Sequence, residues 1–320
     1  MILPDDPKYD VIVITGPTAS GKTTLAVALA TVIGGEIVSA DSRQVYRRMD
    51  IGTGKDLLEY VVDGNRVPYH LIDILEPGEK YNVFEYQRDF LKVFRDIKSR
   101  KKVPIICGGS GMYLDSVVSG YNMFEVPPDT TLRKSLDKKS MKELIDILTT
   151  YKELHNVTDI DSKKRVIRAI EIAHYHKKAK TGQQRFPHLK SLIIGIDLER
   201  ELRRKRISVR LLERLENGLV DEVRNLISGG LEPKSLIYYG LEYKYVTNYI
   251  IGKLSYDEMV SSLETAIHQF AKRQMTWFRG MERRGIKINW IDGNLSTSEK
   301  LSAVERIWSE DQSSESVNYT

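Results

Sequence analysis

The sequence predicts an α/β fold with a parallel sheet core, a helical insert and a helical C-terminal region. Short β-branched runs alternate with helical patterns in the first third of the chain, which is typical of a doubly wound sheet. A charged, helical stretch with no clear strand pattern follows, and strand character returns near Ser191. With 320 residues, of which 41% are hydrophobic and 29% charged, the chain can bury a large core.

The elements of the first third follow from apolar spacing. Apolar residues recur at helical spacing from Leu25 to Ile33, and glycines end that pattern. A second helical face runs from Phe84 to Ile97. The strands expected around these helices are Val11–Thr15, Ile37–Val38, Tyr69–Leu75 and Val103–Cys107.

The change of pattern sets the expected domain boundaries. We expect a discontinuous core at residues 1–120 and 190–310, a helical insert at 121–189 and a flexible polar tail at 311–320. The second core segment opens with the strand Ser191–Asp197, and Lys287–Ile291 is a candidate last strand. The helices expected between them are Glu199–Glu216, Val220–Ile227 and Tyr256–Arg284.

Composition excludes several classes of protein. Cys107 is the single cysteine, so an intrachain disulfide is impossible and nothing indicates an oxidising compartment. No apolar run reaches the roughly 18 residues that a membrane span requires, and the N-terminus has no secretory pattern. We therefore expect a cytoplasmic chain. The net charge of +5 is weak support for a polyanionic partner, because clustering matters more than the sum.

A complete phosphate-binding motif lies between the first strand and the first helix. Residues 16–23 read Gly-Pro-Thr-Ala-Ser-Gly-Lys-Thr, which is the G-x-x-x-x-G-K-[ST] pattern in the context it requires. Backbone N–H groups and the helix N-terminus can cradle phosphates, Lys22 adds a charge, and the Thr23 hydroxyl is placed to hold Mg²⁺. The alternative is a turn that merely connects strand and helix. The motif predicts a P-loop NTPase-like core, without naming the molecule that carries the phosphates.

A carboxylate follows the second strand. Because the carboxyl ends of parallel strands face the ligand crevice, Asp41 should project toward the phosphate loop. It could act as a general base, or it could cap a helix or hold Mg²⁺ indirectly, and position alone leaves both roles open. Ser42, Arg43 and Gln44 could hydrogen-bond bases or phosphates, or form a solvated loop.

Seven ordered motifs resemble one family. They are Gly16–Thr23, Ser39–Tyr46, Met49–Thr53, Pro68–Asp73, Gly108–Leu114, Lys164–Glu171 and Gln269–Arg279. Together they resemble the tRNA dimethylallyltransferases, also called tRNA isopentenyl transferases, from about residue 11 to residue 292. The family transfers a dimethylallyl group from dimethylallyl diphosphate to the exocyclic N6 of adenosine 37, next to the anticodon, and releases pyrophosphate.

The resemblance implies roles for particular residues. Asp41 would accept the N6 proton, and Asp41, Thr23 and Arg210 would be catalytic, with Thr23 on Mg²⁺. Arg206 and Arg210 stand four apart on one helix face. The diphosphate would be bound by Gly16, Pro17, Thr18, Ala19, Ser20, Gly21, Lys22, Thr23, Arg206 and Arg210.

The same resemblance implies a tRNA surface on the insert and on the last long helix. The insert would contact the anticodon stem-loop, and the protein would act as a monomer. Phe270 and Trp277 lie seven apart on a helix, so we expect both in the core. The expected tRNA contacts are Asp41, Ser42, Arg43, Gln44, Ser110, Arg133, Lys164, Arg165, Arg168, Lys272 and Arg273.

The chain departs from the family pattern in places. Gly54 stands where the family often has alanine, and Ser110 where it often has threonine. Residues 238–243 read Tyr-Tyr-Gly-Leu-Glu-Tyr, where the family usually has a Val-Gly-Tyr type sequence near a basic residue.

Three other functions share some of these features. A P-loop nucleotide kinase would turn over ATP without tRNA. An enzyme that prenylates free adenine nucleotides would need neither the insert nor the basic C-terminal helix. An RNA-binding protein with a vestigial P-loop would not need Lys22, Thr23 and Asp41 to be intact.

Overall fold

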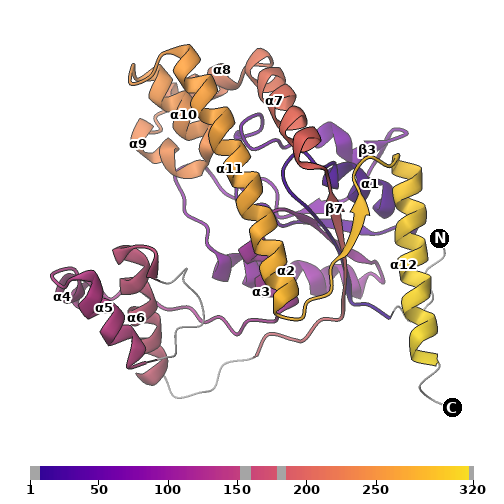
Figure 1. Ribbon diagram of the computed structural model, residues 1–320, viewed down its shortest axis with the longest axis horizontal. Coiled ribbons are helices and arrows are strands. Elements are labelled where there is room, and N and C mark those ends of the chain that lie inside the picture. The colour runs from indigo at the N-terminus through magenta and orange to yellow at the C-terminus, as the bar shows by residue number, and fades with distance from the viewer. Residues whose placement is uncertain (1–7, 152–159, 179–184, 317–320) are drawn as a thin grey trace. The chain divides into compact units, whose positions relative to one another are not determined.

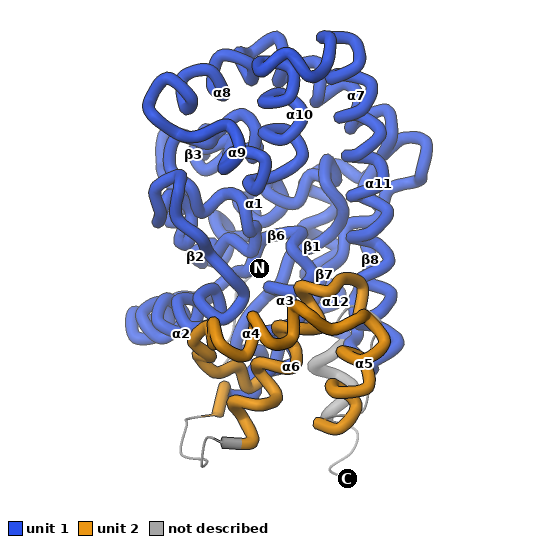
Figure 2. The backbone as a smooth tube through the Cα atoms, turned by 90° about the vertical axis from the view of Figure 1, so that its left-hand side faces the viewer, with its two compact units in different colours: residues 1–121, 187–320 blue, residues 122–186 orange. Residues whose placement is uncertain are grey.

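The structure is a computed structural model that describes residues 8–151, 160–178 and 185–316, with side chains to residue 310. The chain divides into two compact units (Figure 2). Unit 1 combines Met1–Tyr121 with Pro187–Thr320, and unit 2 is Asn122–Phe186. The expected insert, 121–189, has nearly the same limits as unit 2.

A six-stranded parallel sheet forms the centre of unit 1, in the order β5-β2-β6-β1-β7-β8. Its inner strand β1 pairs with β6 through Ile14↔Cys107 and with β7 through Ile14↔Ile194. Every residue of β1, β2 and β6 is buried, as expected for a sheet covered on both faces. The strands are β1 (Val11–Thr15), β2 (Glu36–Ser39), β5 (Tyr69–His70), β6 (Pro104–Gly108), β7 (Ser191–Asp197) and β8 (Asn289–Asp292).

Helices cover both faces of this sheet (Figure 1). Alternate strand residues such as Ile12 and Ile14 pack with Leu29 of α1 (Lys22–Ile33) and Trp308 of α12 (Thr297–Ser316). The opposite face carries α2 (Val83–Ser99), α3 (Gly111–Val118) and α11 (Tyr256–Arg283), which contact one another in sequence. On its other sides α11 contacts α7 (Arg200–Glu216) and α10 (Leu241–Ile250). Helix α10 in turn contacts α8 (Leu219–Ser228), α9 (Pro233–Leu236) and η3 (Ile237–Tyr239).

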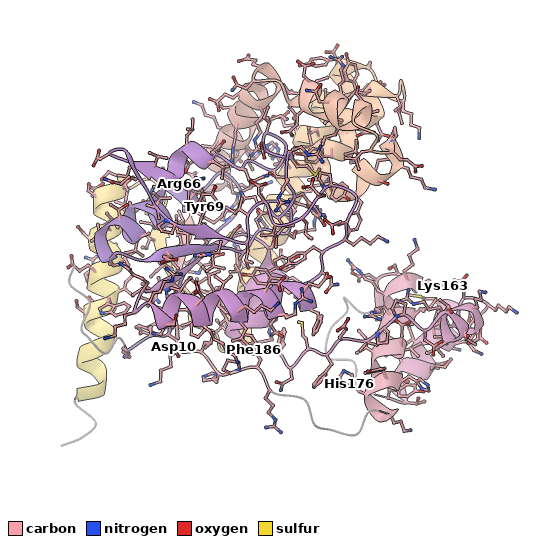
Figure 3. All side chains as sticks on the ribbon, turned by 180° about the vertical axis from the view of Figure 1, so that it is seen from behind. Asp10, Arg66, Tyr69, Lys163, His176 and Phe186 are labelled. Carbon is pink, nitrogen blue, oxygen red and sulfur yellow. The ribbon has the colours of Figure 1, made fainter. Side chains whose placement is uncertain are left out.

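A small hairpin lies between β2 and β5. It follows the 3₁₀ turn η1 (Leu57–Tyr60) and pairs β3 (Val61–Val62) with β4 (Asn65–Arg66). The Arg66 guanidinium lies 4.9 Å from the centroid of the Tyr69 ring (Figure 3). This cation–π contact ties the hairpin to the edge strand β5.

Unit 2 consists of three helices in its described part: α4 (Thr130–Leu136), α5 (Met141–Thr149) and α6 (Lys163–Lys178). A small apolar core of its own joins them, with Leu144, Leu148, Val166 and Ile170 buried. The amphipathic spacing of the sequence explains these helices, since each contributes one apolar stripe.

Several expected elements differ in the structure. The strand expected at Tyr69–Leu75 ends at His70, because Leu71 and Asp73 adopt left-handed φ values of 59° and 55° that interrupt strand pairing. The last strand is Asn289–Asp292, two residues later than its expected start. Helix α12 runs through the first part of the expected tail to Ser316, and residues 317–320 lie outside the described ranges.

The expectation that Phe270 and Trp277 are both core residues was wrong for Phe270, which is 38% exposed. Helix α11 contacts α7 and α10 as well as α3, so its neighbours, and not spacing alone, decide which turn is covered. Trp277 is half-buried against Gly111 of α3, where a side chain would overlap the indole.

Among the described residues, no helix is long and apolar enough to cross a membrane.

Candidate active site

The loop after β1 has the backbone geometry of a phosphate cradle. Gly16 has φ 147°, and a Cβ there would lie 2.7 Å from the Ile196 carbonyl oxygen. Gly21, with φ 83°, precedes α1 and supplies no side-chain cap. The N–H groups in the first turn of α1 are therefore directed at the loop without a capping side chain, which is the arrangement that binds anions.

Lys22 is held inside this loop. Its Nζ donates a hydrogen bond of 2.7 Å to the Pro17 carbonyl oxygen. The pKa of Lys22 is lowered to about 8, chiefly by burial and also by the charge of Arg210, whereas the charges of Asp41 and Glu59 act in the opposite direction. An anion bound in the loop would raise the pKa of Lys22 again, because a nearby negative charge favours the protonated amine.

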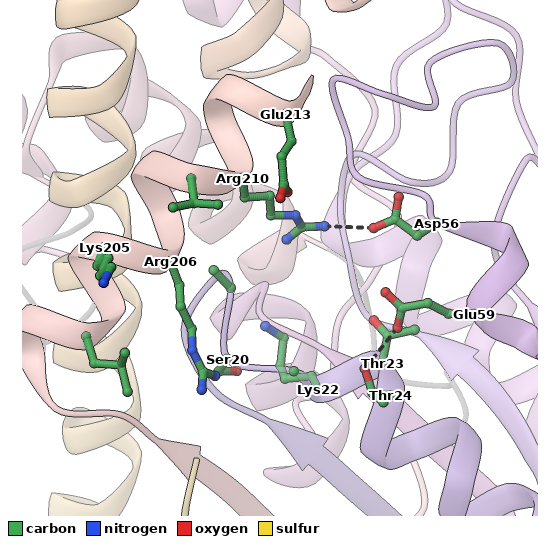
Figure 4. A pocket seen from close by; sticks show the side chains of 14 residues that line it. Ser20, Lys22, Thr23, Thr24, Asp56, Glu59, Lys205, Arg206, Arg210 and Glu213 are labelled. Carbon is green, nitrogen blue, oxygen red and sulfur yellow. Dashed lines mark hydrogen bonds and ion pairs between the residues drawn. The ribbon is translucent and has the colours of Figure 1, made fainter. Parts of the chain in front are cut away.

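A cavity of about 510 Å³ opens between the loop and α7 (Figure 4). Arg206 and Arg210 reach it from α7, one helical turn apart, while Asp56 and Glu59 border it from the segment after β2. Nη2 of Arg210 lies 3.2 Å from Oδ2 of Asp56. The complete lining is Ala19, Ser20, Gly21, Lys22, Thr23, Thr24, Asp56, Glu59, Leu202, Lys205, Arg206, Val209, Arg210 and Glu213.

Ser20 adds an available polar atom to the same wall. Its hydroxyl is fully buried and has no hydrogen-bond partner among the atoms that the structure describes. A buried hydroxyl without a partner is costly unless a ligand or water satisfies it. The cavity lining carries four cationic side chains, Lys22, Lys205, Arg206 and Arg210, and three carboxylates, Asp56, Glu59 and Glu213, so positive charge is in slight excess there.

Asp41 follows β2 and is half-buried. Its Oδ1 accepts a 2.9 Å hydrogen bond from the Arg43 N–H, which fixes the turn after the strand. Its carboxylate is near enough to Lys22 to raise the pKa of that amine. Asp41 is not part of the cavity lining.

The other polar residues after β2 mostly hold the loop in shape. Ser110 accepts a 3.0 Å hydrogen bond from the Ser42 N–H. Gln44 uses both ends of its amide, since Oε1 accepts from Ser39 at 3.1 Å and Nε2 donates to Gly54 at 3.2 Å. These contacts engage side chains for which we expected tRNA contacts.

Arg43 has a different environment. Its guanidinium lies 5.4 Å from the centroid of the Tyr238 ring. This cation–π contact joins the loop after β2 to the segment 238–243, where the sequence departs from the family pattern.

The lysine and arginine side chains of α4, α6 and α11 that we expected to contact tRNA fall into two groups. Lys272 and Arg273 on α11 and Lys164 on α6 are exposed. Arg165 is also exposed but pairs with Asp161. These four side chains can reach a polyanion directly.

Arg133 and Arg168 are instead bound within unit 2. Both pair with the buried carboxylate of Glu171, which Arg133 approaches through Nε at 2.8 Å and Nη2 at 2.7 Å. Nη2 of Arg168 also donates to the Val126 carbonyl oxygen at 3.0 Å. A buried acid needs such partners, so both arginines have a structural role.

Gln274 of α11 is a site residue that sequence reasoning missed. Its Oε1 accepts a 2.9 Å hydrogen bond from the Thr18 N–H, and its Nε2 donates to the Gly109 carbonyl oxygen at 2.9 Å. It therefore joins the phosphate loop to the end of β6. The only signal was its place in the motif Gln269–Arg279 of α11, in which basic and aromatic residues are interleaved. The motif predicted roles for the neighbouring lysine and arginine instead.

The loop Gly52–Lys55 is anchored to protein groups and does not form a second phosphate cradle. Glu222 of α8 accepts hydrogen bonds from the N–H groups of Asp50, Ile51 and Gly52 at 2.7, 2.7 and 3.0 Å. The buried amine of Lys55 pairs with Asp50 at 2.6 Å and with Asp73. Sequence reasoning missed Glu222 because a single acid on a helix carries no motif.

The parallel sheet and the phosphate loop define an α/β protein with a P-loop-like core. The chain belongs to the IPP transferase family, whose model matches residues 44–281. It is therefore a transferase, and the family resemblance of the motifs is confirmed.

Curated relatives match over almost the full chain. The tRNA dimethylallyltransferase 2 of Bacteroides fragilis is 59% identical over 300 residues, which cover 94% of this chain and 98% of that protein. The tRNA dimethylallyltransferase 1 of Parabacteroides distasonis is 60% identical over 299 residues, covering 93% and 97%.

Solved structures agree with the fold. The full-length tRNA isopentenylpyrophosphate transferase of Bacillus halodurans has a TM-score of 0.69 and 29% identity, with 97% of this chain and 98% of that chain covered. The tRNA delta(2)-isopentenylpyrophosphate transferase of Staphylococcus epidermidis has a TM-score of 0.67 and 32% identity, covering 94% and 99%. A eukaryotic dimethylallyltransferase acting on tRNA, at 22% identity and a TM-score of 0.68, shares the fold.

Proposed function

We propose that the protein transfers a dimethylallyl group from dimethylallyl diphosphate to N6 of adenosine 37 in tRNA. The observation that carries this proposal is the cavity lined both by the phosphate loop with Lys22 and by Arg206 and Arg210 of α7. Cations around a phosphate cradle suit an alkyl transfer with a diphosphate leaving group. The relatives named tRNA dimethylallyltransferase support it.

In this proposal the diphosphate occupies the cavity between the loop and α7. The first turn of α1, Lys22 and the two cavity arginines would neutralise its charge. Negative charge grows on the diphosphate as its bond to the allylic carbon lengthens, so contacts that strengthen at this stage speed the reaction.

We include Mg²⁺ in the proposal, with Thr23 as its protein ligand and Asp56 or Glu59 within the same cavity. Among the described residues there is no group of three or more His, Cys, Asp or Glu that could hold a metal. The residues therefore fit an ion held largely by phosphate oxygens and water, which is how Mg²⁺ commonly binds. When bound, it would offset charge on the diphosphate.

The acceptor would be an adenine turned out of its stack. The N6 nitrogen forms a bond to the allylic carbon while the bond from that carbon to the diphosphate oxygen breaks. Asp41 accepts the proton that N6 loses, and pyrophosphate leaves. Extruding the adenine from its stack costs a few kcal/mol. Contacts from exposed basic side chains such as Lys272 and Arg273 to the tRNA backbone would offset this cost. We place the reaction in the cytoplasm and on a monomer.

The direct test is to incubate the protein with dimethylallyl diphosphate, MgCl₂ and total tRNA, and to analyse the digested nucleosides by mass. The expected product is adenosine with one added C5 unit, mapped to position 37. Phosphoryl transfer from ATP without any added C5 unit would instead identify a nucleotide kinase. Prenylation of free AMP in preference to tRNA would identify an enzyme of free nucleotides.

A further inference from the structure

Helix α7 carries a second arginine one turn beyond Arg210. Arg214 is largely buried, with 15% of its side chain exposed, and its Nη1 donates to Oε1 of Glu242 at 3.2 Å. The Glu242 side chain is 17% exposed. Burial lowers the pKa of Arg214 and raises that of Glu242. A buried pair of this kind is costly to assemble and contributes little net stability, so its presence calls for another reason.

Gly54 is where the two arginines meet. It has a left-handed φ of 65°, and a Cβ built there would lie 2.6 Å from Nη2 of Arg210 and would overlap Nη2 of Arg214. Any larger residue would displace both guanidinium groups. Gly54, a departure from the family motif, and Glu242, which lies in the divergent segment 238–243, thus both adjoin the Arg214 guanidinium.

The charges around these arginines are divided in a specific way. Asp56 pairs with Arg210, and Glu242 pairs with Arg214. Glu242 is close enough to Arg210 for that charge to lower its pKa. If Arg214 were absent, the buried carboxylate would attract Arg210 away from the diphosphate cavity, because an unpaired buried acid gains strongly from any nearby cation.

We propose that Arg214, seated on Gly54 and bound to Glu242, is a positioning residue that keeps Arg210 directed at the diphosphate cavity. Arg214 occupies the acid that would otherwise compete for Arg210, and its like charge disfavours movement of Arg210 toward the protein interior. This role rests on the proposed function only in assigning a diphosphate to the cavity.

The first test compares Arg214→Met, Glu242→Met and the double variant. Each single variant should lower Tm, since it leaves one buried charge unpaired, and the double variant should regain most of that loss. The rate constant kcat should fall about ten- to a hundredfold in the Arg214→Met single variant, because misplaced catalytic groups cost that much. It should recover in the double variant, because no buried acid then competes for Arg210. An Arg214→Met variant with wild-type kcat, or a double variant as slow as Arg214→Met, would overturn the proposal.

A matched control is Arg224→Met on α8, which breaks the exposed pair of Arg224 with Asp221. This variant should keep wild-type Tm and kcat, since exposed pairs contribute little. Gly54→Ala adds a second control. Its effect on kcat should be smaller in the Arg214→Met background than in wild type, because the added methyl group then meets no Arg214 guanidinium. Equal effects in both backgrounds would contradict the seat on Gly54.

The deciding measurement does not depend on turnover. Calorimetry with pyrophosphate and MgCl₂ should show binding about tenfold weaker in the Arg214→Met variant than in wild type, as for a lost charged contact. In an Arg210→Met background the Arg214→Met change should leave pyrophosphate affinity unaltered, because Arg214 acts through Arg210. Equal losses in both backgrounds would overturn the proposal. Tight pyrophosphate binding by a protein that does not prenylate tRNA would reject the proposed function alone.

Discussion

The N–H of Thr18 donates to Oε1 of Gln274, 256 positions further along the chain, at 2.9 Å. The other end of that amide donates to Gly109. One buried side chain of α11 thus supports the phosphate loop and the end of a neighbouring strand. An amide can satisfy both partners, since one is a donor and the other an acceptor.

Gln274→Leu should therefore destabilise the protein by about 1–3 kcal/mol, because it leaves two backbone groups without partners. Pyrophosphate affinity should fall as well, since the loop loses its anchor at Thr18. Chemical denaturation and calorimetry would measure the two effects. Gln274→Glu is the informative partner variant, because it still accepts from Thr18 but cannot donate to Gly109 when ionised. Unchanged pyrophosphate affinity in both variants would contradict a supporting role.

The pKa of Lys22, lowered by burial to about 8, predicts a pH dependence of anion binding. Pyrophosphate affinity should fall as pH rises through about 8, because the amine loses its charge. Binding measured from pH 7 to 9.5 would show this. Lys22→Arg should remove the dependence that comes from the lysine, because arginine stays charged. An identical pH profile for Lys22→Arg and wild type would assign the dependence to another group.

The same pKa predicts how the free protein responds to pH. A lysine whose folded-state pKa is lowered binds fewer protons in the folded than in the unfolded state between about pH 8 and its ordinary pKa of 10.5. Stability should therefore rise with pH across this window through this group. The comparison of wild type with Lys22→Met in urea titrations isolates it. A Lys22→Met variant whose stability rises as steeply as that of wild type would contradict this assignment.

Asp41→Asn should lower the rate of prenylation by a factor of about 10²–10⁴, because the amide cannot accept the N6 proton. The affinity for tRNA should remain close to that of wild type. Single-turnover kinetics and filter binding would separate chemistry from binding. A large loss of tRNA affinity with intact chemistry would make Asp41 a binding residue.

Exposed basic side chains and those held in ion pairs within unit 2 should differ in their effect on tRNA binding. Lys272→Ala should reduce the salt slope of the affinity by about one if it contacts one phosphate. Arg133→Ala should instead loosen unit 2, since it removes two hydrogen bonds from buried Glu171, and hydrogen exchange in α4 and α6 should rise. A salt slope changed only by Arg133→Ala would reverse these assignments.

Local patterns in the sequence predicted most of the fold and the centre of the site. The β-branched run at Val11–Thr15, the glycine turn before Lys22 and the helical spacing of α7 and α11 each act within a few residues. Such patterns depend on backbone geometry and on burial of one face, which neighbouring residues determine. Arg206 and Arg210 could be placed on one face for the same reason.

Tertiary structure alone decided which distant groups meet. Gln274 on Thr18, Glu222 on the backbone of residues 50–52, Arg214 on Gly54 and Arg133 on Glu171 all join segments far apart in the chain. Polar groups that become buried must find partners wherever packing brings them, and a single sequence carries no periodic signal for such pairs. The sequence by itself determined a phosphate cradle and a candidate general base, Asp41, and packing decided which residues hold them in place.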